Sequence, residues 1–317
     1  AAAPELRRVQ LGQRNNAGFT VQVVGFSTSR EISSLQISLT AGAEVDRPLM
    51  VLALKGLFDA AEAATSAVDH LVRLYDGQQI AEIDPETFFN FMGHRPSVSL
   101  DSNGDRLISW PTTRGYAVRT GGDTSDLVVV SGVEPHLRWR TFTDALVELA
   151  HATNTVMVIT IGAMAGMAPH TRTLGVVGSA ANPAVADRLG LSRPSYQGPT
   201  GLVGALHDRL DAEGMPVVSL RVSVPHYVPG PPNAEATRSL LSRFELVTGV
   251  TTNHADLDEQ ASDWRRRIDA AVADDDELSS YVRHLEEQLD QAEVMPSGDD
   301  IAAELEAFLR DERDDGA

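Results

Sequence analysis

Side chains that could bind an anion, move a proton or ligate a metal follow four apolar runs of this chain. They are Lys55 and Asp59 after 49–54, His136 after 127–130, His170 and Arg172 after 156–167, and His226 after 217–224. Short runs rich in Val, Ile and Leu that alternate with helical stretches are typical of buried parallel strands. In an open parallel sheet, ligands bind beyond the carboxyl ends of the strands. We therefore expect these six side chains to gather on one rim of a sheet.

Each of the three histidines in this set follows a proline directly. Imidazoles from three strand ends could ligate Zn²⁺ through His136, His170 and His226. The chain has neither an HExxH pattern nor a close histidine pair, and it has no Cys. The simpler interpretation is that each proline ends a strand and each histidine caps a carbonyl. We expect no metal and no cofactor.

Lys55 is the only lysine of the chain, and arginine supplies every other permanently charged basic side chain. A lysine retained in such a composition suggests that its compact charge or its geometry matters. It could bind an anion or a carboxylate. The structural alternative is an ion pair with Asp59, four residues on, or with Glu134.

Two arginines, Arg138 and Arg140, stand on either side of Trp139. This spacing suits an anion or a carboxylate of a partner. Structural ion pairs with Glu134 or Glu148 explain the two arginines equally well.

A glycine-rich stretch, 198–204, surrounds Thr200 before a predicted helix. Its backbone N–H groups could hold an anion at the start of the helix. It matches neither the Walker A pattern nor the dinucleotide-binding fingerprint. Thr200 as the residue that caps the helix is the favoured interpretation.

Composition limits the classes of partner. Hydrophobic residues make up 42% and charged residues 22%, as in ordinary globular proteins. We see no signal peptide, and the longest apolar stretch, 156–168, is too short to span a bilayer, so we expect a cytoplasmic protein. Of the net charge of −19, residues 251–317 carry −15, from 21 acidic residues and 6 arginines. Such a surface repels nucleic acid and anionic lipid, and we interpret it as a solvated helical face rather than an acidic docking arm.

The pattern of apolar residues predicts the fold class. We expect an α/β protein, a three-layer α/β/α sandwich with a mostly parallel sheet and a C-terminal helical extension. The expected parts are N-terminal strands or an edge extension over 1–47, the sandwich over 48–250, and an acidic α-helical extension over 251–317. The expected strands are 49–54, 80–83, 127–133, 156–163, 173–178 and 216–224, with a hairpin over 97–110; the expected helices are 60–74, 140–152, 183–189, 200–213 and 234–247, then three amphipathic helices that begin near 257, 278 and 301.

Seven ordered motifs between about Asp46 and Gln291 resemble the PAC2 family, the proteasome assembly chaperone 2 family, in its actinobacterial branch. They are LKGLFDAAEAA from Leu54, EIDPETFF from Glu82, WPT from Trp110, GVEPHLRWR from Gly132, PHTR from Pro169, YQGPTG from Tyr196 and VPHY from Val224. The resemblance implies a sandwich similar to that of the nucleoside phosphorylases, and self-association, with a trimer as one form. Eukaryotic members are non-enzymatic chaperones that hold proteasome α subunits. The printed ending, Arg313 to Ala317, lacks the hydrophobic-Tyr-x tail of some of these chaperones, so we do not expect docking through it.

Two functions remain open. The first is a non-enzymatic, chaperone-like or protein-interaction role, with an unidentified protein partner. The second is a small-molecule or nucleoside-binding protein, or an enzyme, that uses the rim. No side chain is assigned as catalytic, because neither a Gly-x-Ser-x-Gly elbow nor a pair of buried carboxylates is evident. The candidate ligand or anion rim consists of Lys55, Asp59, His136, Arg138, Arg140, His170, Arg172, Thr200 and His226.

Overall fold

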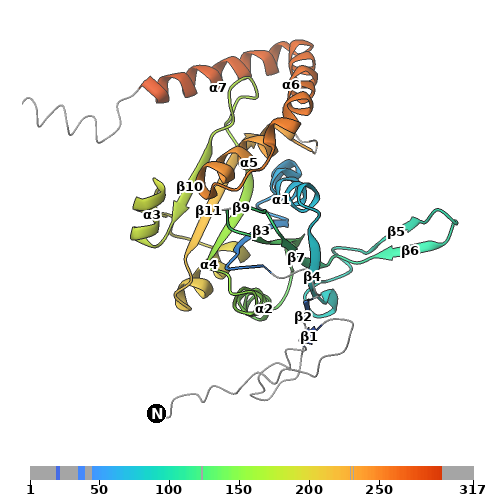
Figure 1. Ribbon diagram of the computed structural model, residues 1–317. Helices are drawn as coiled ribbons and strands as arrows, with labels where there is room; N and C mark the ends of the chain where they lie inside the picture. The colour runs from blue at the N-terminus through green and yellow to red at the C-terminus, as the bar shows by residue number, and fades with distance from the viewer. Residues whose placement is uncertain are drawn as a thin grey trace, which may run out of the picture.

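A nine-stranded sheet with helices on both faces forms the centre of the molecule (Figure 1). The computed structural model describes residues 19–21, 35–39, 45–122, 124–228, 230 and 232–294. Along the sheet the strands run in the order β1-β2-β4-β7-β8-β3-β9-β11-β10. The α/β sandwich predicted from the sequence is confirmed.

The bounds of the elements are as follows. The strands are β1 (Phe19–Val21), β2 (Leu35–Leu39), β3 (Leu49–Lys55), β4 (Gln78–Ile83), β5 (Ser97–Leu100), β6 (Arg106–Ser109), β7 (Thr113–Val118), β8 (Leu127–Val133), β9 (Met157–Gly166), β10 (Val176–Ala180) and β11 (Val217–Pro225). The helices are α1 (Ala63–Leu74), α2 (Trp139–Ala152), α3 (Pro183–Leu189), α4 (Leu202–Ala212), α5 (Ala234–Thr248), α6 (Asp258–Ala273) and α7 (Asp276–Val294), with short 3₁₀ turns η1 (Ala60–Glu62), η2 (Pro85–Thr87) and η3 (His254–Leu257).

Four parallel strands, β8, β3, β9 and β11, occupy the middle of the sheet. The strands on either side pair antiparallel: β1, β2, β4 and β7 beyond β8, and β10 beyond β11. The first six residues of β3, Leu49 to Leu54, are all buried. A strand buried on both faces needs an unbroken apolar run, which is why the sequence marks the parallel strands more clearly than the antiparallel ones.

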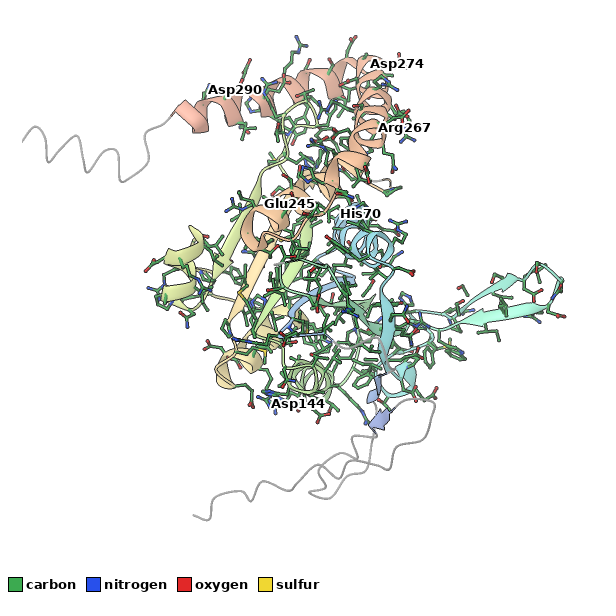
Figure 2. The ribbon with its side chains drawn as sticks, viewed as in Figure 1. His70, Asp144, Glu245, Arg267, Asp274 and Asp290 are labelled. Carbon is green, nitrogen blue, oxygen red and sulfur yellow. The ribbon has the colours of Figure 1, made fainter. Side chains whose placement is uncertain are left out.

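Alternate residues of β3 serve two separate cores. Val51 and its neighbours pack with buried residues of α1 and α5, whereas Leu52 packs with buried residues of α2 and α4. Figure 2 shows the same division, with His70 of α1 and Glu245 of α5 on one side of the sheet and Asp144 of α2 on the other. The sheet is therefore the middle of three layers.

The observed elements differ from the predicted ones in three places. Strand β7 is absent from the sequence prediction, because Arg114 and Gly115 interrupt its apolar pattern. The strand expected over 173–178 begins at Val176 and runs antiparallel. The helix expected from residue 60 begins at Ala63, because Ala61 and Glu62 adopt positive φ angles of 53° each, which end the preceding 3₁₀ turn.

The hairpin and two of the three C-terminal helices are confirmed. β5 and β6 pair around a turn in which Asp101 Oδ1 accepts hydrogen bonds from the N–H groups of Asn103 and Asp105, and Gly104 has a φ of 85°. α6 buries Ala261 and Trp264, and its contacts are made mainly with α5. The helix predicted near 301 lies outside the described residues. In the part of the chain that the structure describes, no helix is long and apolar enough to cross a membrane.

Replacement of Gly132 by alanine should destabilise the fold. Thr113 of β7 lies against Gly132 of β8, next to the register pair of Arg114 and Ser131, and an added Cβ would lie 2.5 Å from the Thr113 Cα atom. Because that atom belongs to the backbone, the strands must separate, at a cost of about 1–3 kcal/mol. Urea unfolding measures the loss. The matched variant Gly175→Ala, whose new Cβ meets nothing within 4 Å, should unfold like the wild type, and equal stabilities of the two variants would contradict this account.

Candidate functional site

The carboxyl ends of the four parallel strands lie on one edge of the sheet. Lys55, the last residue of β3, is the register partner of Val133 on β8, and Gly166 of β9 is the partner of Pro225 on β11. His136, His170 and His226 come after these strand ends in the chain. The hydrogen bonds divide this edge, called the rim below, into a half at β9 and β11 and a half at β3 and β8.

His170 is buried under the C-terminal helices. Its side chain is 1% exposed, Nδ1 lies 2.7 Å from the hydroxyl of Tyr227, and Nε2 lies 3.1 Å from Oδ1 of Asp269 on α6. Because the carboxylate of Asp269 can only accept, the proton of the neutral ring lies on Nε2, and Nδ1 accepts the proton of the Tyr227 hydroxyl. The backbone N–H of His170 donates to the same Tyr227 oxygen. Burial lowers the pKa of His170 despite the neighbouring carboxylate. A neutral His170 therefore joins β9, β11 and α6.

Arg172 binds α7 through two carboxylates. Its guanidinium lies 3.2 Å from Glu286 and makes contacts of 3.0 and 3.2 Å with the two oxygens of Asp290. The hydroxyl of Thr171 donates to the same Glu286 oxygen. Hydrogen bonds from Arg172 lower the pKa of Asp290. Figure 2 shows Asp290 on α7, at the end of the molecule opposite α2.

His226 also contacts α7. Its Nδ1 lies 3.1 Å from the carbonyl oxygen of Gly166, and its Nε2 lies 3.3 Å from the hydroxyl of Tyr281. The rings of Tyr227 and Tyr281 stand at right angles to it, with centroids 5.6 and 5.7 Å away. The expectation that this histidine caps a carbonyl is therefore met in part, and the same ring holds a helix.

The sequence analysis missed the partners of these rim residues. Asp269, Tyr281, Glu286 and Asp290 all lie in the stretch that we interpreted as a solvated acidic face. One signal could have revealed them: Glu286 and Asp290 are four residues apart, so they share a face of α7 beside the buried Leu285. A carboxylate pair beside an apolar stripe indicates a face that meets basic groups.

At β3, Lys55 pairs with Glu62 and not with Asp59, so the expected pair is wrong. Asp59 instead binds the first turn of helix α1, from a position four residues before the helix. Its side chain accepts hydrogen bonds from the N–H groups of Ala64 (2.9 Å) and Thr65 (3.0 Å) and from the Thr65 hydroxyl (2.5 Å). Burial raises the pKa of Asp59, against these hydrogen bonds. Its role in the fold is that of a helix cap.

At β8, Glu134 and His136 make local contacts. An oxygen of Glu134 accepts the N–H of Leu57 at 3.0 Å, which ties the end of β8 to the loop after β3. The exposed ring of His136 stands against Phe89 (5.7 Å) and His94 (6.2 Å). Its backbone N–H donates to the carbonyl of Phe88. This ring lies apart from the cluster of His170 and His226, and the described residues contain no group of three His, Asp or Glu side chains that could hold a metal ion.

Three further candidates differ from expectation. Arg138 and Arg140 are exposed and form no ion pair with any described carboxylate, so the pairs suggested with Glu134 and Glu148 are not made. Thr200 lies two residues before the start of α4, and the capping residue is Gly201. A Cβ on Gly201 would lie 3.2 Å from the Phe58 ring. The glycine therefore allows the loop to approach β3 closely.

A cavity of about 360 Å³ lies at the root of the β5–β6 hairpin, and none of the predicted rim residues lines it. Its lining consists of Glu82, Asp84, Pro85, Glu86, Ile108, Ser109, Trp110, Thr112 and Arg114. Glu82 is bound to Arg114 at 3.1 Å, and Asp84 accepts the N–H of Glu86 at 2.9 Å. No general base faces an oriented nucleophile among the contacts of this lining.

Comparison with known proteins places this arrangement in a family. The chain matches the PAC2 family over residues 53–272. It is 42% identical to a PAC2 family protein of known structure from Streptomyces avermitilis, with a TM-score of 0.69 over 74% of this chain and 99% of that one. The chain belongs to the PAC2 family.

Other similar structures bear names that mention the proteasome. A proteasome-assembly chaperone homologue from Mycobacterium tuberculosis is 39% identical, with a TM-score of 0.67 over 74% of this PAC2 chain and 99% of that one. A Pyrococcus furiosus protein described as an archaeal proteasome activator shares the fold at 16% identity, with a TM-score of 0.60 over 75% of this chain and 97% of that one. Among curated proteins, none matches this chain.

Glu286 should hold α7 on the body of this PAC2 protein. Glu286→Ala removes the acceptor of Thr171 and one acceptor of Arg172, so α7 should open more often. A loss of about 1.4 kcal/mol, within the range for hydrogen bonds to charged groups, corresponds to tenfold faster amide exchange. Hydrogen exchange along α7 measures it. The neighbouring variant Glu287→Ala, at an exposed position, should exchange like the wild type; equal protection in both variants would refute the docking role.

The folded state of this PAC2 protein should lose stability as the pH is lowered, because His207 is buried as a neutral ring. This ring on α4 lies 2.9 Å from the Thr160 hydroxyl, and burial lowers its pKa to about 4, with the charge of Arg221 acting in the same direction. Between pH 6.5 and about 4, the unfolded chain therefore binds a proton that the folded chain does not. Stability due to His207 is constant above pH 6.5 and decreases below it by at most about 1.4 kcal/mol per pH unit.

The variant His207→Gln isolates this contribution, because glutamine does not titrate. The difference in unfolding free energy between wild type and variant, measured in urea from pH 7.5 to 4.5, should shift against the wild type as the pH falls. A difference that stays constant across that range would mean that His207 does not titrate as described.

Proposed function

We propose that this PAC2 protein is a non-enzymatic, chaperone-like protein that works by binding other proteins, in the cytoplasm, and that associates with itself. The observation that carries the proposal is the use of the rim side chains. Asp59 caps a helix, Lys55 is paired with Glu62, and His170 and Arg172 bind α6 and α7. These groups are engaged in holding the fold together, which leaves fewer of them to act on a substrate.

The surfaces that remain exposed support a role in binding proteins. Leu57 beyond β3 and Leu137 beyond β8 are 68% and 49% exposed. Large apolar side chains that stay in water at a sheet edge are typical of surfaces that meet other proteins. The proteasome is the proposed context, because one relative at 39% identity is described as a proteasome-assembly chaperone homologue. A trimer, as the family resemblance implies, is the form proposed for the self-association.

Two assays test the proposal. The purified protein, mixed with separately purified actinobacterial proteasome α and β subunits, should form a complex with the α subunits in native mass spectrometry. Incubated with purine and pyrimidine nucleosides and phosphate, it should release no base. Absence of binding to either subunit would overturn the proteasome context.

Turnover would favour the alternative of a small-molecule enzyme. The decisive outcome against a non-enzymatic role is base release by the wild type that is lost in Lys55→Ala while the variant melts at the wild-type temperature. The side chain of Lys55 forms an ion pair with Glu62, and both side chains are more than a third exposed, so this substitution should change stability by no more than about 1 kcal/mol.

A further inference from the structure

The hairpin β5–β6 stands out from the body of the molecule as a two-stranded ribbon (Figure 1). All of its eight strand residues are exposed, although several are large and apolar. Val98, Leu100, Leu107 and Ile108 are 51%, 66%, 51% and 56% exposed. An isolated two-stranded hairpin is marginally stable in water. A ribbon of this composition therefore gains stability when another surface covers it.

The register places three of the apolar side chains on one face of the ribbon. Val98 is paired with Ile108, and Leu100 is paired with Arg106 two positions along. Because side chains alternate between faces, Val98, Ile108 and Leu100 lie on the same face and Leu107 on the other. Both long edges of the ribbon are also unpaired in its sheet of two strands. One apolar face with free edges is a surface suited to docking.

The root of the ribbon is acidic. Ile108 and Trp110 line the cavity there, together with the carboxylates of Glu82, Asp84 and Glu86. Arg114 is the one basic side chain in this lining and is bound to Glu82. The side chain of Glu86 has no partner among the described residues. A partner that covers the ribbon thus meets an excess of negative charge at its base.

A basic apolar corner lies on the same edge of the same sheet. Leu137 is 49% exposed, and the flanking Arg138 and Arg140 have no carboxylate partner among residues 45–122, 124–228, 230 and 232–294. β4 and β8 both pair antiparallel with β7, so they run in the same direction and end at the same edge. The acidic root and the corner of Leu137, Arg138 and Arg140 are therefore neighbours on one surface, with opposite charge.

We propose that the ribbon and its acidic root bind the basic corner of a second copy of this chain. The inference rests on the self-association proposed above and names its surface. The occupant is indicated by charge complementarity, because the chain carries both an unpaired carboxylate beside exposed apolar side chains and unpaired arginines beside an exposed leucine. Each copy supplies one ribbon and one corner, so a reciprocal pair or a closed ring leaves neither surface unused.

Charge exchange between copies tests the contact. Glu86→Arg alone and the double substitution Arg138→Glu with Arg140→Glu alone should each raise the dissociation constant of self-association by about tenfold or more, because like charges then face each other. A third variant that carries all three substitutions should associate like the wild type, since every root then meets a corner of opposite charge, in a pair or in a ring of any size. Sedimentation equilibrium with light scattering measures all three. Glu287→Arg, an exposed charge reversal on α7, is the matched control and should behave like the wild type.

An apolar substitution provides the second arm. Ile108→Ser should weaken association by a similar factor, whereas Leu246→Ser, on α5 and 74% exposed, should not. Circular dichroism melts confirm that each variant is folded. A wild type that stays monomeric at high concentration would overturn both this contact and the self-association itself. An oligomer that is indifferent to the ribbon and corner variants, or is not restored when all three charge substitutions are combined in one chain, would overturn the contact alone. Binding to proteasome subunits is scored separately.

Discussion

The burial of β3 on both faces is the constraint on which the rest of the structure depends. Six consecutive apolar residues, Leu49 to Leu54, are removed from water between two helical layers. A strand in that position accepts no unpaired polar side chain in its interior, since an unsatisfied buried polar group costs about 1–3 kcal/mol. The charged residue of β3, Lys55, is therefore confined to the end of the strand, and the parallel arrangement brings four strand ends to one edge. The burial of the strands is therefore enough to explain why polar residues lie at the rim, without any functional role for them.

The chemistry of the rim is then decided by what covers it. Over β9 and β11, a neutral His170, 1% exposed, and the cationic Arg172 meet carboxylates of α6 and α7. The connection between α5 and α6 is also fixed to the body: Thr252 donates twice to Glu245, and its carbonyl oxygen lies 2.7 Å from His70 Nε2. The acidic stretch is thus partly neutralised by the body instead of being left to water. The carboxylates of α6 and α7, which the sequence suggests are solvated, therefore form one side of an interface with the body.

The elements whose positions depend on the burial of apolar side chains could be predicted from the sequence. The pairing of β7 and the partners of the rim side chains could not. The central strands and their helices were found from apolar periodicity, because each strand between two layers must be continuously apolar. β7 was missed, because Arg114 and Gly115 interrupt its apolar pattern, whereas its backbone pairings with β4 and β8 can be made by any residue. Placement of the rim histidines at strand ends followed from topology alone. Their partners could not be derived, because Asp269 and Tyr281 are more than 50 residues away in sequence from the histidines they contact.

Lys55 shows that spacing along the sequence does not by itself identify the partner of an ion pair. A carboxylate four residues on is an ion-pair partner only if the intervening backbone is helical. Here the positive φ angles of Ala61 and Glu62 change the direction of the chain, and Glu62 forms the ion pair with Lys55. The side chain of Asp59 is buried and accepts hydrogen bonds from the first turn of α1. The local conformation is set by the sharp entry of the chain into α1 from β3, which composition does not record.

The two halves of the rim differ in a way that bears on function. Where α6 and α7 cover it, charged groups meet within one chain; at β8, the same kind of basic group, Arg138 and Arg140, meets no described carboxylate. Arg138 is held at a φ of 55° at the start of α2, a conformation that costs free energy for a residue with a Cβ. Strain of this kind persists where the surrounding contacts fix the backbone, and here Leu137 and His136 both donate to the Phe88 carbonyl. The corner is therefore rigid and exposed at once, and a preformed surface of this kind loses little conformational entropy when a partner binds.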